Sequence, residues 1–254
     1  MVSILRAVNG VSFNLSAGKI LGVVGESGSG KSVTAYSIMQ ILADTGRVVE
    51  GKILYKGQNL LDFSKKEMES FRGDKCSIIF QDPMTSLNPV FTVGYQLMEA
   101  LRLHTSYKSR SAAKERAIEL LKMVGVNEPE KRVNQYPFEF SGGMRQRVMI
   151  AMALACEPDI LIADEPTTAL DVTIQAQIID LLLDLNRKEG MSILFISHDL
   201  RVVRRLCSRV IVMQKGKIVE NGRTKDVFAH PEHSYTRHLI EAIPSRDKRL
   251  NEDE

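Results

Sequence analysis

The fold is decided by the stretch Ile20-Leu21-Gly22-Val23-Val24-Gly25-Glu26-Ser27-Gly28-Ser29-Gly30-Lys31-Ser32. Its first five residues form a short apolar run that predicts a strand, and a helix is predicted to begin at Lys31. Residues 25–32 fit the pattern G-x-x-x-x-G-K-[ST]. Glycines let the backbone fold around an anion, and the helix start adds the positive end of its dipole. The stretch therefore predicts a phosphate-binding loop, in which Lys31 reaches the β- and γ-phosphates and the Ser32 hydroxyl binds Mg²⁺.

Length and composition describe an ordinary globular chain. The 254 residues are 44% hydrophobic and 26% charged, which excludes a disordered or fibrous protein. The length fits one large domain or two small ones. The net charge of +3 is too small to indicate nucleic acid or anionic lipid as a partner. The 3 cysteines form no Cys-x-x-Cys pair, so we expect buried free thiols rather than disulfides or a thiolate metal site.

The sequence has no apolar stretch of the length that a bilayer requires. Its longest apolar run, residues 148–156, is about half of the roughly 18 residues of a transmembrane helix. The N-terminal residues lack the basic segment and apolar core of a signal peptide. We therefore expect the chain on the cytosolic side of the membrane.

Strand and helix patterns alternate along much of the chain. Apolar or alternating runs predict strands at residues 11–15, 20–24, 52–55, 77–80, 160–163 and 193–196. Helices are predicted at residues 174–187 and 200–206, and a hairpin joins 210–213 to 217–220. Strands separated by helices imply a mainly parallel sheet with crossover connections.

Residues 81 to about 155 have a helical pattern instead. Ser111 is a candidate cap for one of these helices, and Gly125 is a candidate stop. Because this section interrupts the alternation of strands and helices, we expect an inserted helical unit.

Two carboxylates follow the apolar run at residues 160–163. Asp164 is predicted to lie at the carboxyl edge of the sheet, near the Mg²⁺ of the phosphate loop. Glu165 points in another direction, where a carboxylate can orient an attacking water and accept its proton. His198 follows the next strand and is a candidate contact of the γ-phosphate. The three side chains and Lys31 predict a hydrolase site.

A second motif makes the chain resemble a known family. Residues 140–147 are Phe140-Ser141-Gly142-Gly143-Met144-Arg145-Gln146-Arg147, and they resemble the signature motif of the ATP-binding subunits of ABC transporters. Gln81 is similar to the Q-loop glutamine of that family, Asp171 lies in a match to its D-loop, and His198 is similar to its switch histidine. These motifs occur in the order that the family has.

The resemblance covers residues 11 to 244 and implies the α/β fold of P-loop NTPases. That fold has a RecA-like core with a mainly parallel sheet, an inserted helical subdomain and a small antiparallel β portion. We expect one ATP-binding domain over residues 1–254, divided into a core (1–81 and 157–230), a helical subdomain (82–156) and a C-terminal extension (231–254).

The mechanism of the family implies a head-to-tail dimer that holds two ATP molecules between its subunits. A serine and two glycines before a helix present hydroxyl and backbone donors, which suit the γ-phosphate of ATP bound to the other subunit. The implied catalytic residues are Lys31, Gln81, Glu165 and His198. The implied ligands of Mg²⁺ are Ser32, Gln81 and Asp164. The implied nucleotide-binding residues are Gly25, Glu26, Ser27, Gly28, Ser29, Gly30, Lys31, Ser32, Val33, Ser141, Gly142, Gly143 and Asp171.

Within the family, residues 80–89, 163–171 and 234–244 resemble the dipeptide, oligopeptide and nickel importers. The resemblance implies an ATPase that energises import of a small solute, di- or oligopeptides before nickel, through two transmembrane permease subunits. An extracytoplasmic solute-binding protein would act indirectly, and the ATPase would lie peripherally on the cytoplasmic face of the membrane.

Two other classes of function compete with import. A soluble ABC ATPase of DNA repair or translation would carry long coiled coils or a second phosphate loop, and the sequence has neither. A nucleotide switch that does not hydrolyse ATP would need neither Glu165 nor His198. We expect no nucleic acid among the partners.

The sequence departs from its relatives in two places. Nothing aromatic precedes Phe13, which we predict to be a core residue, although these ATPases stack an aromatic ring on adenine. Either apolar contacts alone hold the adenine, or the native chain begins before Met1, which we favour. No cysteine follows Cys207, so no iron–sulfur cluster is predicted.

Histidines near the C-terminus offer an alternative metal site. His230, His233 and His238 could be ligands, and nickel importers are among the similar proteins. A tight site needs fixed supporting partners, so we expect these side chains to lie on a solvated surface. The arginines at 201, 204 and 205 are likewise expected on an exposed helix face.

Overall fold

The computed structural model describes residues 5–82, 86–168 and 170–243. Its central sheet has six strands: β1 (Ile20–Val24), β4 (Cys76–Ile79), β5 (Ile160–Asp164), β6 (Ser192–Ser197), β7 (Arg209–Gln214) and β8 (Lys217–Arg223). They lie in the order β4-β5-β6-β1-β7-β8, and all neighbours are parallel except β7 and β8. A separate antiparallel pair consists of β2 (Leu54–Tyr55) and β3 (Gln58–Asn59). The predicted fold class is confirmed.

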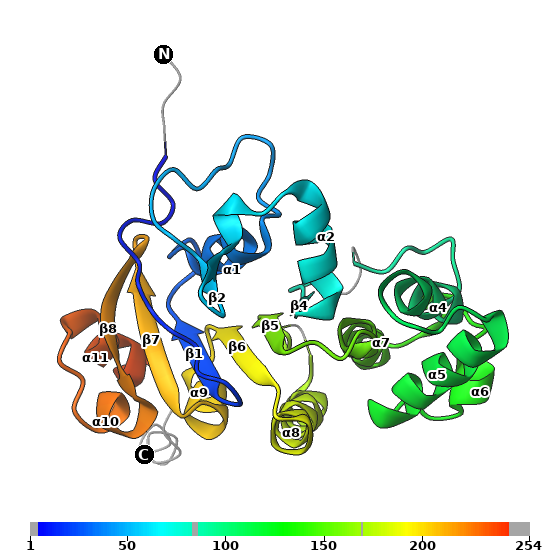
Figure 1. The fold of residues 1–254 in the computed structure, drawn as a ribbon. Coiled ribbons are helices and arrows are strands. Elements are labelled where there is room, and N and C mark those ends of the chain that lie inside the picture. Colours follow the sequence, from blue (N-terminus) through cyan, green and yellow to red (C-terminus); the bar gives the residue numbers. More distant parts are fainter. Residues whose placement is uncertain (1–4, 83–85, 169, 244–254) are drawn as a thin grey trace, which may run out of the picture.

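Helices cover the sheet and extend beyond one edge of it (Figure 1). They are α1 (Lys31–Met39), α2 (Lys65–Asp74), α4 (Val93–His104), α5 (Arg110–Met123), α6 (Pro129–Arg132), α7 (Gly142–Leu154), α8 (Val172–Glu189), α9 (Leu200–Leu206), α10 (Thr224–Ala229) and α11 (Ser234–Glu241). Short 3₁₀ turns occur at Leu60–Asp62 and Pro137–Glu139. No helix in the described ranges is long and apolar enough to cross a membrane.

Alternate side chains of each parallel strand point to opposite faces of the sheet, and a core cluster covers each face. In β6, Ile193 and Phe195 join the larger core cluster, whereas Leu194 and Ile196 join a smaller one. Side chains of α1 and α2 complete the smaller cluster, and those of α7, α8 and α9 belong to the larger one. Helices therefore pack on both sides of the parallel strands.

The helical section predicted between residues 81 and 155 forms α4 to α7, which lie together beyond β4 in Figure 1. Apolar residues of α4, α5 and α7 belong to the same large cluster as the sheet, so the section shares the main core. The N-terminal cap of α5 is Ser109, whose hydroxyl accepts the N–H of Ala112 at 3.1 Å. The prediction of Ser111 as this cap was therefore wrong by two residues.

The strand predicted at residues 11–15 is absent from the described chain, where this segment has irregular backbone. An alternating pattern forms a strand only where a neighbouring strand supplies hydrogen bonds, and among the described residues this segment pairs with none. Val11 and Leu15 pack partly against the smaller cluster, but Phe13 is 36% exposed. Phe13 is therefore not the core residue that the pattern predicted. The strand predicted at residues 52–55 is shortened to 54–55.

The carboxyl ends of four parallel strands meet at one edge of the sheet. The strand order puts β4, β5, β6 and β1 side by side. The chain leaves them toward Gln81, Glu165, His198 and Gly25, respectively. Residues far apart in the sequence are thereby collected along this edge, which is where open parallel sheets bind ligands.

Candidate functional site

The phosphate loop follows β1 and requires glycine at two of its positions. Gly25 has φ +151°, and a Cβ there would lie 2.2 Å from the carbonyl oxygen of Met213. Gly30 has φ +101°, and a Cβ there would lie 2.7 Å from the carbonyl oxygen of Ala7. The Gly30 cap of α1 has no side chain to occupy the first N–H groups of the helix. The loop therefore leaves backbone donors available to an anion.

The Lys31 ammonium is held against the backbone of this loop. The side chain is 4% exposed, and its Nζ donates to the carbonyl oxygens of Gly25 at 2.8 Å and Glu26 at 3.0 Å. Glu165 Oε1 lies 3.8 Å from Nζ. Burial lowers the pKa of Lys31, although the charges of Glu165 and Asp164 oppose this shift. The ammonium is thus positioned at the loop, where it can donate to a phosphate oxygen.

Asp164 and Ser32 form a pair of oxygen ligands that suits a hard divalent cation. The Ser32 hydroxyl donates to Oδ1 of Asp164 at 3.0 Å, and Asp164 is fully buried. Its Oδ2 has no hydrogen-bond partner among the described residues. Burial raises the pKa of Asp164. Burial and the nearby charge of Asp164 raise the pKa of Tyr36 to about 12. An unpartnered buried carboxylate oxygen is costly unless a cation binds it, so these residues fit Mg²⁺.

The Glu165 carboxylate lies at the centre of a cluster of polar side chains, formed by Lys31, Gln81, Thr168 and His198. Its Oε2 accepts hydrogen bonds from Gln81 Nε2 at 3.1 Å and Thr168 Oγ1 at 3.0 Å, and His198 Nδ1 lies 3.0 Å away. The backbone of Glu165 has φ +48°, and its side chain is 12% exposed. Three polar groups therefore fix the carboxylate in one position, while Oε1 faces Lys31. Such a carboxylate can accept a proton from a water at the adjoining surface.

The Ser141 motif lies at the start of α7 rather than in this cluster. Ser141 caps the helix by accepting the N–H of Met144 at 3.4 Å, and both Ser141 and Gly142 are exposed. A Cβ on Gly142 would meet no atom within 4 Å, whereas one on Gly143 would lie 2.7 Å from Cγ2 of Ile174. In the described ranges, no hydrogen bond links these residues to the phosphate loop. The motif is therefore open to a ligand or partner from outside.

Comparison with protein families gives a direct match. A family model described as "ABC transporter" matches residues 8–168. The chain belongs to the ABC transporter family. The resemblance inferred from the sequence motifs is thereby confirmed.

Individual relatives within the family include proteins named for peptide transport. The chain is 55% identical to a probable peptide ABC transporter ATP-binding protein of Sinorhizobium fredii, an alignment that covers 96% of this chain and 73% of the relative. It is 53% identical to the oligopeptide transport ATP-binding protein OppD of Bacillus subtilis, over 98% of this chain and 70% of OppD. The chain is 52% identical to the dipeptide transport ATP-binding protein DppD of Haemophilus influenzae, over 94% of this chain and 72% of DppD.

Solved structures agree with the fold. A dimeric ATP-binding cassette, determined in a post-hydrolysis state with ADP and Pi, has 31% identity and a TM-score of 0.78. The alignment covers 87% of this chain and 92% of the cassette. The protein cbiO1 of Clostridium perfringens, described as part of the ABC transporter complex cbiONQ, has 29% identity and a TM-score of 0.76. The alignment covers 97% of this chain and 92% of cbiO1.

The D-loop residue of this ABC chain is a helix cap in the structure. The Asp171 carboxylate accepts the N–H of Ile174 at 2.9 Å at the start of α8, and Asp171 is exposed. Its predicted contact with nucleotide stays a prediction, and residue 169 of the same motif lies outside the described residues.

Two contacts of the cluster were missed by reasoning from the sequence. Thr168 stands three residues after Glu165, and this spacing in a strand-to-helix turn could have indicated that its hydroxyl reaches the carboxylate. Tyr235 lies 209 residues from the phosphate loop, yet its hydroxyl accepts the N–H of Glu26 at 2.9 Å. The local sequence carries no signal for so distant a pairing.

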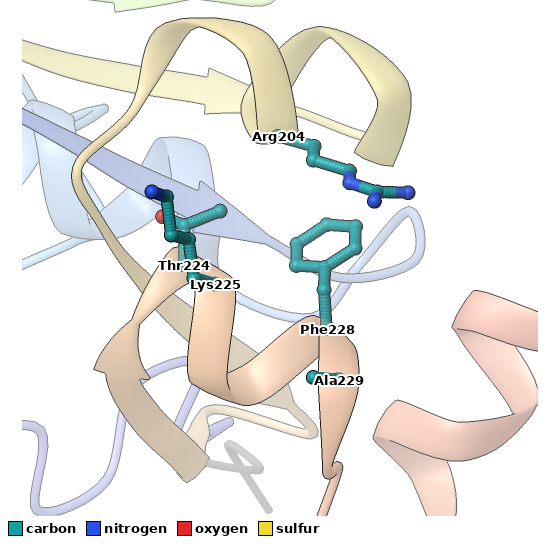
Figure 2. Close-up of a pocket in the computed structure, with 5 residues that line it drawn as sticks. All are labelled: Arg204, Thr224, Lys225, Phe228 and Ala229. Atoms are coloured by element: carbon teal, nitrogen blue, oxygen red, sulfur yellow. The ribbon is translucent and has the colours of Figure 1, made fainter.

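A separate pocket of about 340 Å³ lies between α9 and α10. Figure 2 shows Arg204 beside the ring of Phe228, and the guanidinium carbon is 5.9 Å from the ring centroid. Thr224, Lys225 and Ala229 complete the lining. None of the predicted site residues lines this pocket, so the candidate site is the sheet edge and not the pocket.

Proposed function

We propose that this chain is the ATP-hydrolysing subunit of an importer of di- or oligopeptides. The observation that carries the proposal is the convergence of Lys31, Ser32, Asp164 and Glu165 on one phosphate loop at the carboxyl edge of the sheet. The peptide substrate is supported by relatives that are named for peptide, dipeptide and oligopeptide transport. Nickel import remains the second candidate because nickel importers resemble the same motifs.

In this proposal, the phosphate loop and Lys31 bind the β- and γ-phosphates of ATP. Backbone donors come from residues 25–33, apart from the Glu26 N–H that Tyr235 accepts. Lys31 keeps its bond to the Gly25 carbonyl and exchanges the Glu26 carbonyl for a phosphate oxygen. Ser32 and Asp164 would hold Mg²⁺ together with Gln81, whose side chain lies beside Glu165. When bound, Mg²⁺ supplies positive charge that offsets the charge on the phosphate oxygens.

Glu165 is the proposed general base. Its carboxylate takes a proton from the water that attacks the γ-phosphate, and Thr168 and Gln81 hold it in the orientation that this transfer needs. His198 pairs with the same oxygen and is proposed to contact the γ-phosphate. The cluster thus combines a base with groups that fix its direction.

A second subunit is proposed to complete the site. Ser141 and Gly142 are exposed, and Gly143 is half-buried, at the start of a thirteen-residue helix, where hydroxyl and backbone donors suit a phosphate of ATP bound to the other subunit. A similar cassette is dimeric with ADP and Pi, which supports a pair of subunits. The head-to-tail arrangement of that pair is part of the proposal. Asp171 at the adjoining D-loop is proposed to contact this interface.

The remaining partners follow from the same proposal. Two transmembrane permease subunits carry the solute, the ATPase binds them peripherally at the cytoplasmic face, and an extracytoplasmic solute-binding protein delivers the solute. The division into a core (1–81 and 157–230), a helical subdomain (82–156) and a C-terminal extension (231–254) is part of this proposal.

The hydrolytic role is tested by Glu165→Gln. We expect ATP binding to persist, a closed dimer to accumulate, and turnover to fall by at least about a hundredfold, because the base is lost and the shape is kept. Lys31→Ala should instead weaken ATP binding. Glu69→Gln, at an exposed position of α2, is the matched control and should leave both unchanged. Persistent turnover in Glu165→Gln would reject Glu165 as the base.

The solute is tested separately. Cells that contain the permeases and either the wild-type chain or Lys31→Ala are given a radiolabelled dipeptide or ⁶³Ni²⁺. Peptide uptake that depends on Lys31 supports the proposal. Uptake of ⁶³Ni²⁺ alone would replace peptide import by the nickel alternative.

A further inference from the structure

The C-terminal helix α11 makes one polar contact with the phosphate loop. The backbone N–H of Glu26 donates to Oη of Tyr235 at 2.9 Å, and Tyr235 is only 7% exposed. Figure 1 shows α11 beside β8, at the opposite end of the sheet from α4 and α5. The contact thus joins the last described helix of the chain to the loop that follows its first strand.

The carboxylate of Glu220 fixes α11 on the sheet. Glu220 belongs to β8, and its two oxygens accept the N–H groups of Glu232 and His233, each at 3.0 Å. Burial opposes the ionisation of Glu220, but the nearby Thr236 hydroxyl and the hydrogen bonds from these two N–H groups outweigh it and lower the pKa. Glu220 is therefore an ionised anchor at the start of α11. Because Tyr235 lies in the first turn of α11, this anchor fixes the position from which its side chain extends.

The same peptide unit of the loop is held from both sides. The N–H of Glu26 and the C=O of Gly25 belong to one planar peptide group and point in opposite directions. Tyr235 Oη accepts from this N–H, and the C=O accepts from Lys31 Nζ at 2.8 Å. Rotation of this peptide plane would break both hydrogen bonds at once. The phenol of Tyr235 therefore constrains the loop carbonyl that positions the lysine.

We propose that Tyr235 is a positioning residue for nucleotide binding, which acts by clamping the Gly25–Glu26 peptide against Lys31. Tyr235 itself contacts no substrate in this role. Loss of its hydroxyl leaves the N–H of Glu26 without its acceptor, and the loop samples conformations that must be excluded again when ATP binds. The inference rests on the assignment of the phosphate loop proposed above.

The test compares Tyr235→Phe with Tyr55→Phe in the full chain. The Tyr55 hydroxyl also makes a hydrogen bond, which it donates to the Asp159 side chain, but Tyr55 lies on β2 outside the phosphate loop. Affinities are measured by titration with a fluorescent ATP analogue, kcat and KM by ATP hydrolysis, and folding by thermal denaturation without nucleotide. For Tyr235→Phe we expect a three- to tenfold weaker affinity, a matching rise in KM and a kcat within twofold of wild type. Tyr55→Phe should bind as wild type does.

A second variant tests the anchor. Glu220→Gln removes the charge that holds α11, so it should weaken binding in the same direction as Tyr235→Phe. Because both act through one contact, the double variant should be no more than twofold weaker than Tyr235→Phe alone. Effects that multiply independently would overturn the clamp.

The outcomes separate this inference from the proposed function. ATP binding by the wild-type chain and its loss in Lys31→Ala test the phosphate loop alone. Given that result, an unchanged affinity in Tyr235→Phe overturns the positioning role. Equal weakening in Tyr235→Phe and Tyr55→Phe overturns it too, because general destabilisation then accounts for the effect.

Discussion

Replacing Asp164 by asparagine should stabilise the chain when no nucleotide is bound. Asp164 is fully buried, and its Oδ2 has no hydrogen-bond partner among the described residues. Burial raises the pKa of this carboxyl, although Ser32, Tyr36 and Lys31 favour the ionised form. At neutral pH the ionised group therefore destabilises the folded state, because its charge is better solvated in the unfolded chain.

The size of the effect follows from the buried charge. Asparagine keeps the shape and removes that charge, but its amide still places a polar atom without a partner at the Oδ2 position. The gain in stability is therefore at the low end of the roughly 0.5–3 kcal/mol by which single substitutions change stability. Part of this gain is offset because Lys31 loses a nearby negative charge, so we expect about 1 kcal/mol. For a chain of this length, that corresponds to a rise in Tm of about 2–4 °C.

The pH dependence has a definite sign. Below the ordinary aspartate pKa of 3.8, the carboxyl is protonated in both the folded and the unfolded state, so Asp164→Asn adds little to the free energy of unfolding. As the pH rises above this value, the unfolded carboxyl loses its proton first, and the wild type loses stability relative to the variant. The difference becomes constant once the folded carboxyl is also ionised, above its raised pKa.

Thermal denaturation in EDTA between pH 4.5 and 8 measures this difference. Asp44→Asn, the same change at an exposed position after α1, is the matched control and should leave Tm unchanged. Added Mg²⁺ and ATP should raise the Tm of the wild type more than that of Asp164→Asn, because the variant lacks a carboxylate for the cation. An Asp164→Asn chain that melts below the wild type without nucleotide would refute this account of Asp164.

Three further perturbations follow from individual contacts. Thr168→Val removes the hydroxyl that donates to Glu165, so kcat should fall about fivefold with little change in the KM for ATP; an unchanged kcat would show that the hydrogen bond is dispensable. Gly25→Ala should destabilise the chain by more than about 2 kcal/mol in denaturant unfolding, because its Cβ would clash with the Met213 carbonyl, whereas Gly28→Ala has open space and should cost less; equal losses would contradict the clash. Iodoacetamide at pH 7.5 should modify Cys156 slowly and spare the buried Cys76 and Cys207. The reason is that burial raises the pKa of Cys156 to about 11 and that of Cys76 to about 12, and also raises the pKa of Cys207. Mass spectrometry should find all three cysteines modified after unfolding, and early modification of Cys207 in the folded chain would contradict its burial.

The parts of the fold that the sequence predicts well are those governed by local chemistry. The phosphate loop combines a strand, glycines and a helix start within thirteen residues, so its position in the chain can be recognised from the local sequence alone. Asp164 and His198 could be placed because each follows an apolar strand, and parallel strands end at a common edge.

The parts that the sequence does not predict depend on distant partners. Residues 11–15 alternate as a strand does, yet they pair with no strand among the described residues. The hydroxyl of Tyr235 meets the Glu26 N–H because β8 and α11 bring it back to the loop, which no local pattern encodes. The role proposed for the Ser141 motif needs a second subunit, so the structure of one chain does not test it.

The backbone at Glu165 has a consequence for how this chain can change. Its φ of +48° lies in the left-handed region, which costs a residue with a Cβ about 1–2 kcal/mol and which glycine or asparagine occupies more easily. Selection for thermal stability alone would therefore favour replacing the glutamate, whereas selection for turnover would retain it in its proposed role as the general base. Stability and activity oppose each other at this one position, and a heat-tolerant relative must gain its stability elsewhere.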